Sequence, residues 1–100
     1  WSMGIAYNEE QGHFYVTYLD DPPRSLTNVR LAIFDTDWNS IANIAVTQYA
    51  DHSFSQTGRP WVILHNHHVY VSFDTSTMNP KTMEENKDWE CTVSSYEITN

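Results

Sequence analysis

Two short stretches decide the fold of this chain: His13-Phe14-Tyr15-Val16-Thr17-Tyr18 and His68-Val69-Tyr70-Val71-Ser72-Phe73. The second stretch follows the first at a spacing of 55 residues, and the two share three identical and two conservative pairs. Self-similarity at a fixed spacing is the signature of a structural repeat. The sequence therefore predicts two copies of one unit.

The repeat extends to both sides of these stretches. Upstream, residues 2–8 align with residues 60–66 at a spacing of 58, and downstream residues 31–35 align with residues 93–97 at a spacing of 62. Strands are retained in repeats while the loops between them vary in length, so the spacing changes only between segments. We expect the first unit to span residues 1–50 and the second residues 51–100.

Each matched segment has the composition of a β-strand. Val, Ile, Thr, Tyr and Phe are frequent within the segments, and Gly, Pro, Asn and Asp lie at their ends. Strands are predicted at residues 3–8, 13–19, 28–35 and 41–48 of the first copy, and at 60–65, 68–74 and 89–98 of the second. Asn66-His67 predicts a tight hairpin turn. Since no window shows a helical period, the chain is predicted to be all-β.

The predicted strands are apolar on both faces. Phe14, Val16 and Tyr18 share one face of their strand, while Tyr15 and Leu19 share the other. Such a sheet needs cover on both sides, which a radial stack of four-stranded sheets provides. The expected fold is therefore two β-propeller-like blades, each a four-stranded antiparallel sheet, with the second blade lacking its outer strand.

Two further motifs support this interpretation by resemblance. One reads Arg59-Pro60-Trp61-Val62 followed by Val69-Tyr70-Val71-Ser72-Phe73-Asp74, and the other reads Leu31-Ala32-Ile33-Phe34-Asp35-Thr36-Asp37-Trp38-Asn39. These motifs resemble the β-propeller repeats of extracellular and glycan-associated proteins. The resemblance implies a non-catalytic module, extracellular or at the cell surface, that binds a glycan or a protein or serves as a structural repeat.

A seven-strand β-sandwich of the immunoglobulin type is the alternative fold, because it has a similar length and strand number. The propeller interpretation makes a further demand, since a closed propeller needs roughly four to eight blades. Either the remainder of a longer chain or further copies of this chain, as a homo-oligomer, would complete the ring.

Charge and composition exclude several classes of partner. The chain has 100 residues, with five Lys and Arg against thirteen Asp and Glu, which gives a net charge of −8. The five basic residues are scattered singly, so nucleic acid is not an expected partner. No apolar run approaches the length of a membrane span. At 40% hydrophobic residues, the sequence predicts a folded chain with one core at most.

The sequence contains none of the common catalytic motifs, such as G-x-S-x-G, G-x-G-x-x-G or H-E-x-x-H. Whether the chain is an enzyme stays open at this point. One alternative is a segment of a propeller glycosidase, with catalytic carboxylates among Asp20, Asp21, Asp35 and Asp74. Another is a secreted structural subunit that assembles through its open strand edges.

Calcium is the one cofactor that the sequence suggests. Asp35, Asp37, Asn39 and Asn43 place oxygen-bearing side chains at positions 1, 3, 5 and 9 of a segment, a spacing that suits a Ca²⁺ loop. The alternative is a hairpin turn in which Asp and Asn side chains accept backbone hydrogen bonds while Trp38 packs on a neighbour.

Three residues are candidates for a ligand-binding wall: Trp61, Trp89 and Arg59. Trp61 follows Arg59-Pro60 at the start of a predicted strand, and Trp89 ends an acidic loop. Flat aromatic side chains stack on sugar rings, so both tryptophans suit a glycan site.

Histidine and cysteine residues offer two further interpretations. His65 and His68 flank the tight turn closely enough to share a metal ion, with His13 and His52 as additional ligands, although a structural role is the alternative. Cys91 is the only cysteine, so no internal disulfide forms. Because it lies in an alternating segment, we expect a small buried thiol rather than a nucleophile.

Overall fold

The computed structural model describes residues 3–20, 28–47, 55–77 and 90–98, with side chains described for all of these except residues 55–59, 75–77 and 90. Seven strands form, as predicted, and the described segments contain no helix. The strands are β1 (Gly4–Asn8), β2 (His13–Asp20), β3 (Asn28–Phe34), β4 (Ser40–Ala45), β5 (Ser55–His65), β6 (His68–Thr77) and β7 (Glu90–Glu97). β5 begins at Ser55 rather than at residue 60, and β6 extends to Thr77.

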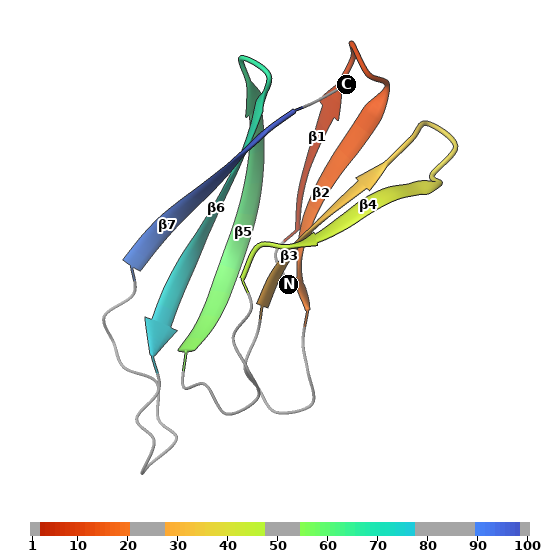
Figure 1. The fold of residues 1–100 in the computed structure, drawn as a ribbon. Helices are drawn as coiled ribbons and strands as arrows, with labels where there is room; N and C mark the ends of the chain where they lie inside the picture. The colour runs from red at the N-terminus through yellow and green to blue at the C-terminus, as the bar shows by residue number, and fades with distance from the viewer. Residues whose placement is uncertain (1–2, 21–27, 48–54, 78–89, 99–100) are drawn as a thin grey trace.

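The strands form two antiparallel sheets, here called sheet A and sheet B. Sheet A has the order β1-β2-β3-β4 and sheet B the order β5-β6-β7, so each sheet is a meander of consecutive strands (Figure 1). An immunoglobulin sandwich instead exchanges strands between its sheets through Greek-key connections. The prediction of an all-β chain with one four-stranded and one three-stranded sheet is confirmed.

The predicted hairpin turns form as their residues dictate. His65 pairs with His68 across Asn66 and His67, whose φ angles of 48° and 61° are those of a type I′ turn. The β1–β2 turn is longer, and Gly12 takes a φ of 72° while its N–H donates to the carbonyl oxygen of Asn8 at 2.8 Å. Each turn fixes the register of the hairpin that it closes.

One hydrophobic core lies between the two sheets. Sheet A supplies Tyr15, Val29 and Leu31 to it, and sheet B supplies Val62, Val69, Val71 and Phe73. Each such side chain stabilises the fold by roughly 1.5–3 kcal/mol through its removal from water. β5 is the strand of sheet B that contacts β1, β2 and β3, whereas β4 and β7 lie on the far sides of their sheets (Figure 1).

Large apolar side chains are also exposed, and they lie on the two outer faces. In sheet A the exposed group is Met3, Ile5, Tyr7, Trp38 and Ile41; in sheet B it is Trp61, Ile63 and Val93. Alternation explains the placement of the members that lie in strands, because every second residue of a strand points away from the core, whereas Met3 precedes β1 and Trp38 lies in the β3–β4 turn. Both sheets therefore carry apolar residues on both faces, as expected from the sequence.

The strand pairing tests the repeat residue by residue. Val16 pairs with Ala32 in sheet A, and at spacings of 55 and 62 their equivalents Val71 and Ser94 pair in sheet B. The predicted alignment of the second and third strands is thus confirmed.

The predicted alignment of the first strand is wrong by one residue. Ile5 pairs with Val16, and Val62 pairs with Val71, so the spacing is 57 and not 58. Ile5 is therefore equivalent to Val62 rather than to Ile63.

The equivalent faces of the two sheets do not face each other. Tyr15 points into the core, but its equivalent Tyr70 lies on the outer face of sheet B; Val16 lies on the outer face of sheet A, but Val71 is in the core. We call the face with Tyr15 or Tyr70 the front face, and the face with Val16 or Val71 the back face. Within the chain, the front face of sheet A packs on the back face of sheet B.

Candidate functional site

The tips of the β1–β2 and β5–β6 hairpins enclose an open cleft of about 390 Å³. Its lining residues are Tyr7, Asn8, Glu9, Glu10, Leu64, His65, Asn66, His67 and Ile98. Both hairpins lie at the same end of the two sheets (Figure 1), which brings residues of different repeats together. Leu64 and Ile98 also pack against the core, so the cleft has an apolar floor and a polar rim.

The rim formed by the β1–β2 turn is held by its own side chains. The Oδ1 atom of Asn8 accepts hydrogen bonds from the N–H groups of Glu10, at 3.0 Å, and Gln11, at 3.3 Å. The Tyr15 hydroxyl donates to Oε1 of Gln11 at 2.6 Å, and the Nδ2 of Asn8 donates to the same atom at 3.0 Å. Burial raises the pKa of Tyr15, so its hydroxyl remains a donor at neutral pH. This network fixes the turn that presents the exposed Glu9 and Glu10.

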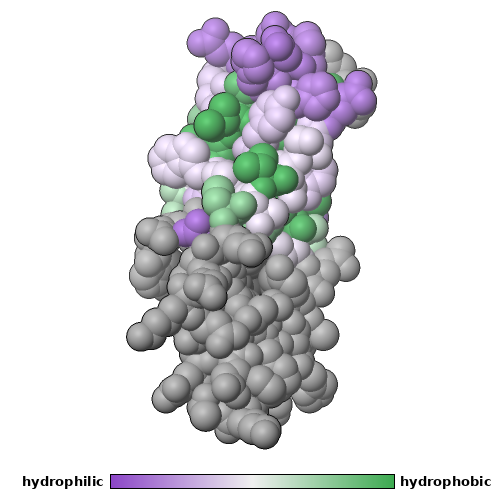
Figure 2. All heavy atoms as spheres, turned by 90° about the vertical axis from the view of Figure 1, so that its left-hand side faces the viewer, coloured by the Kyte–Doolittle hydropathy of each residue, from purple (hydrophilic) through white to green (hydrophobic). Residues whose placement is uncertain are grey.

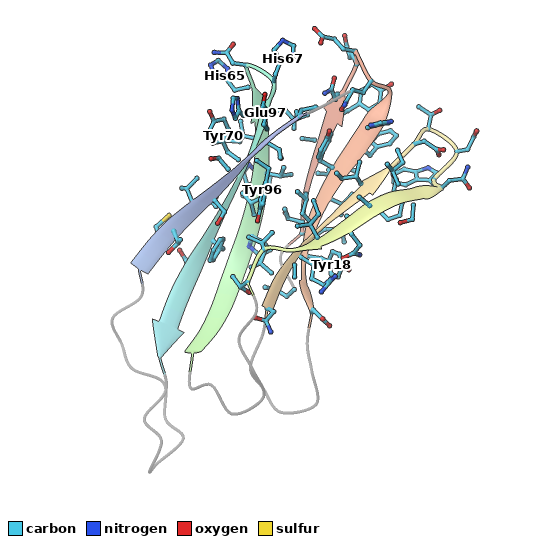
Figure 3. All side chains as sticks on the ribbon, in the orientation of Figure 1. Tyr18, His65, His67, Tyr70, Tyr96 and Glu97 are labelled. Carbon is cyan, nitrogen blue, oxygen red and sulfur yellow. The ribbon has the colours of Figure 1, made fainter. Side chains whose placement is uncertain are left out.

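The opposite rim is formed by the β5–β6 turn. His65 and His67 are exposed at its tip, with Glu97 of β7 nearby (Figure 3). The Nδ1 atom of His68 lies 2.9 Å from the carbonyl oxygen of Asn66, and the N–H of Ile98 donates to the carbonyl oxygen of His67 at 2.7 Å. Hydrophilic side chains gather at this end of sheet B (Figure 2).

The rims of the cleft carry groups that can donate and accept hydrogen bonds. The Glu9 and Glu10 carboxylates accept hydrogen bonds, while the amides and imidazoles of the rim both donate and accept. Tyr7 also belongs to the lining, but its ring packs on Phe14 on the outer face of sheet A, at a centroid distance of 4.7 Å. The groups of the two rims suit a ligand with many hydroxyl groups.

The predicted calcium loop forms a turn that its own side chains stabilise. Oδ1 of Asp35 accepts hydrogen bonds from the N–H groups of Asp37 and Asn39, both at 2.9 Å, and Nδ2 of Asn39 donates to Oδ2 of Asp35 at 3.2 Å. The N–H of Asn39 is the main cause that lowers the pKa of Asp35. Asn43 lies on β4, where Nε of Arg30 donates to its Oδ1 at 2.6 Å.

Trp38 completes this turn. Its φ of 63° directs the chain back, and its ring stacks on Phe14 at a centroid distance of 4.6 Å with an angle of 11° between the planes. The alternative interpretation, a hairpin turn with Trp38 packed on a neighbour, describes this geometry. Calcium binding by Asp35, Asp37, Asn39 and Asn43 stays a prediction.

The three predicted ligand-wall residues are not brought together at the cleft. Trp61 is exposed on the front face of sheet B and is not part of the cleft lining. Trp89 lies outside the described residues, as does the side chain of Arg59.

The predicted metal and thiol residues take separate places. His65, His68 and Glu97 share one row across sheet B, and within the described segments no three His, Cys, Asp or Glu side chains are grouped to hold a metal ion. His52 lies outside the described residues.

The expectation of a buried Cys91 is wrong: the thiol is exposed, because it shares the outer face of β7 with Val93.

The candidate glycosidase carboxylates are dispersed. Asp20 ends β2 at one end of sheet A, whereas Asp35 follows β3 at the other end, and Asp74 lies in sheet B. Asp21 lies outside the described residues. Glu9 and Glu10 were not predicted as site residues. The repeat indicated them, because the turn at residues 9–12 occupies the position in the first copy that the turn at residues 66–67 occupies in the second.

Searches of known protein families, curated proteins and solved structures found no match to this chain. The part of the chain that the structure describes has no helix long and apolar enough to cross a membrane.

Proposed function

We propose that the chain is a non-catalytic glycan-binding module of two propeller-type blades, acting outside the cell or at its surface, with the hairpin-tip cleft as its binding site. The observation that carries the proposal is the cleft itself, with fixed polar groups on two rims and the apolar residues Leu64 and Ile98 in its lining.

The arrangement of the sheets supports the propeller part of the proposal. β1 and β5, the equivalent first strands, contact each other, whereas the last strands β4 and β7 lie far apart (Figure 1). The sheets also pack front to back, as rotated copies in a radial stack must, because every copy presents the same face to its next neighbour. A sandwich of two sheets needs neither feature.

The rim residues support a glycan as the ligand. A sugar ring offers hydroxyl groups that donate to the Glu9 and Glu10 carboxylates and accept from the rim amides, while its apolar face packs on the apolar lining residues Leu64 and Ile98. The turns that hold these groups are closed by backbone hydrogen bonds and left-handed residues, so little ordering is needed on binding.

The placement of the carboxylates supports a non-catalytic role. Glycoside hydrolysis uses two carboxyl groups on opposite sides of the scissile bond, roughly 5–9.5 Å apart. Glu9 and Glu10 are neighbours in one exposed turn, the facing rim carries His65, Asn66 and His67, and Glu97 lies on the outer face of sheet B and is not part of the cleft lining.

A glycan array probed with the labelled 100-residue chain tests this function. We expect binding to a subset of glycans, and a loss of roughly 10-fold or more in affinity for the Glu9→Gln/Glu10→Gln variant, since hydrogen bonds to charged groups contribute about 1.5–3 kcal/mol. Asp20→Asn is the matched control, because it neutralises an exposed carboxylate at the other end of sheet A. Equal binding by all three proteins, or no bound glycan, would overturn the proposal.

A further inference from the structure

We propose that a second copy of this chain docks on the exposed faces, so that the back face of sheet A in one copy packs on the front face of sheet B in the next. The inference rests on one part of the proposed function, that the two sheets are propeller-type blades. It adds that the partner of each free face is a second copy of the chain.

The apolar exposure of the chain is concentrated on these two faces. The back face of sheet A exposes Ile5 and Tyr7, and the front face of sheet B exposes Trp61, Ile63 and Val93. Several large apolar side chains exposed on one face of a sheet are a feature of interaction surfaces.

Two pairs of equivalent positions are buried in one sheet and exposed in the other, whereas Val16 and its equivalent Val71 are both buried. On the back face, Val62 is 3% exposed while its equivalent Ile5 is 55% exposed. On the front face, Leu31 is 0% exposed while its equivalent Val93 is 58% exposed. The two free faces are therefore versions of the two faces that already pack together inside the chain.

The free back face of sheet A is preorganised by its aromatic rings. Phe14 lies between Tyr7, at a centroid distance of 4.7 Å, and Trp38, at 4.6 Å, and Phe34 lies 5.8 Å from Trp38. Rings held by one another lose little side-chain freedom on association, which favours binding of an apolar partner.

The correspondence of faces selects a head-to-tail interface. Docking of a front face on a back face brings together the same two kinds of face that meet inside the chain, whereas contact between two identical faces has no counterpart there. Head-to-tail contacts close into rings when the rotation between copies permits and otherwise extend into filaments. Trp61 of sheet B is equivalent to Gly4 of sheet A. Between two docked copies the Trp61 indole would lie between the sheets, so the copies would be further apart at this position than the two sheets are inside one chain.

The net charge opposes this association. Each copy carries −8, so copies repel one another at low ionic strength, and added salt screens the repulsion. Association should therefore become stronger, not weaker, as the salt concentration rises.

Mixing two blocked variants tests the proposal. Ile5→Glu charges the back face of sheet A, Val93→Glu charges the front face of sheet B, and Thr36→Glu adds the same charge in an exposed loop as the control. In sedimentation velocity, the unchanged chain and Thr36→Glu should form multimers, whereas each face variant alone should be monomeric. A 1:1 mixture of the face variants should form dimers and nothing larger, because only one productive interface remains.

Circular dichroism and thermal melts of the variants establish that each is folded. Three outcomes would overturn the proposal. The unchanged chain could be monomeric at every protein and salt concentration, one face variant could form dimers alone, or the mixture could form no dimer. The glycan array reports separately on the cleft, because the Glu9→Gln/Glu10→Gln variant should assemble like the unchanged chain.

Discussion

Gly4 lies so close to the backbone of Val62 that no side chain fits between β1 and β5. A Cβ atom on Gly4 would stand 3.0 Å from the amide nitrogen of Val62, 3.1 Å from Cα of Trp61 and 2.7 Å from Oγ1 of Thr17. Backbone atoms in a paired strand cannot move aside singly. This contact therefore sets how closely sheet B approaches sheet A at their first strands.

Gly4→Ala should destabilise the fold by about 1–3 kcal/mol, the usual effect of overpacking a filled interior. Urea unfolding measures the loss. Gly12→Asn serves as the control, because a Cβ on Gly12 would meet only Cγ2 of Thr36, at an ordinary contact distance of 4.0 Å, and Asn adopts a φ of 72° more readily than other residues with a side chain. An unchanged unfolding midpoint for Gly4→Ala would contradict the close packing of β1 on β5.

Thr17→Val should stabilise the chain by about 1–2 kcal/mol. The Thr17 side chain is fully buried, and its Oγ1 has no hydrogen-bond partner in the described part of the chain. A methyl group of similar size removes this unpaired hydroxyl. Thr47→Val is the matched control and should destabilise, because Thr47 Oγ1 accepts from the N–H of Val29 and donates to Asn28. Thermal unfolding of the two variants should therefore shift in opposite directions, and a loss of stability in both would count against this account of Thr17.

Acid should loosen the β3–β4 turn through Asp35. Hydrogen bonds, chiefly from the N–H of Asn39, lower the pKa of Asp35 from its ordinary value of 3.8. The folded state thus favours the carboxylate, so its contribution is present above pH 3.8 and is lost as the pH falls through the lowered pKa. The near-ultraviolet circular dichroism of the Trp38–Phe14 stack should follow this loss.

The matched variants isolate the role of Asp35. Asp35→Asn should weaken the near-ultraviolet circular dichroism of Trp38 already at neutral pH. Asp37→Asn should still lose this circular dichroism in acid, because Asp37 contributes its backbone N–H to the turn and not its carboxylate. An acid transition that persists in Asp35→Asn would assign it to another group.

Alkaline pH should destabilise the chain through Tyr15 and Tyr96. Burial raises the pKa of both phenols above the ordinary value of 10.0, so the folded state favours their neutral forms. This stability is fully present below pH 10.0 and is lost as the pH rises through the raised pKa values. Ultraviolet titration should show these two phenols ionising above pH 10.0, and Tyr96→Phe should move alkaline unfolding to higher pH. Ionisation of both at the ordinary value would contradict their burial.

The sequence was sufficient to predict the strands and turns, because their signals are local. The β-branched and aromatic residues of His13–Tyr18 and His68–Phe73 mark strands, and Asn66-His67 can adopt the left-handed angles of a tight turn. Such features depend on neighbours in the chain and not on the packing of distant segments.

The register of the first strand could not be obtained in the same way. Matching Ile5 to Ile63 looked best by residue type, but the β1–β2 turn is longer than the β5–β6 turn, and pairing matches Ile5 to Val62. A slip of one residue exchanges the two faces of a strand. The prediction for Cys91 failed for a related reason, because alternation does not say which face of β7 turns inward.

The cleft depends on the packing of the two sheets. Glu10 and His67 lie in turns of different hairpins, and only the position of sheet B on sheet A brings them to one site. Sequence analysis instead selected Trp61 and Trp89 by residue type, without information on which side chains the fold would bring together.

Crosslinking between copies tests the front-to-back stack most directly. Inside the chain, Thr17 and Val62 lie close together at Gly4. Their equivalents on the two free faces are Ser72 and Ile5, respectively, so these two residues should lie close together between docked copies. In a Cys91→Ser background, chains with Ile5→Cys are mixed with chains carrying Ser72→Cys and treated with a bifunctional thiol reagent spanning about 10 Å, the usual separation of packed sheets. The account predicts covalent dimers that join residue 5 of one chain to residue 72 of the other. Dimers linked through two copies of the same position, or no crosslinked product, would contradict it.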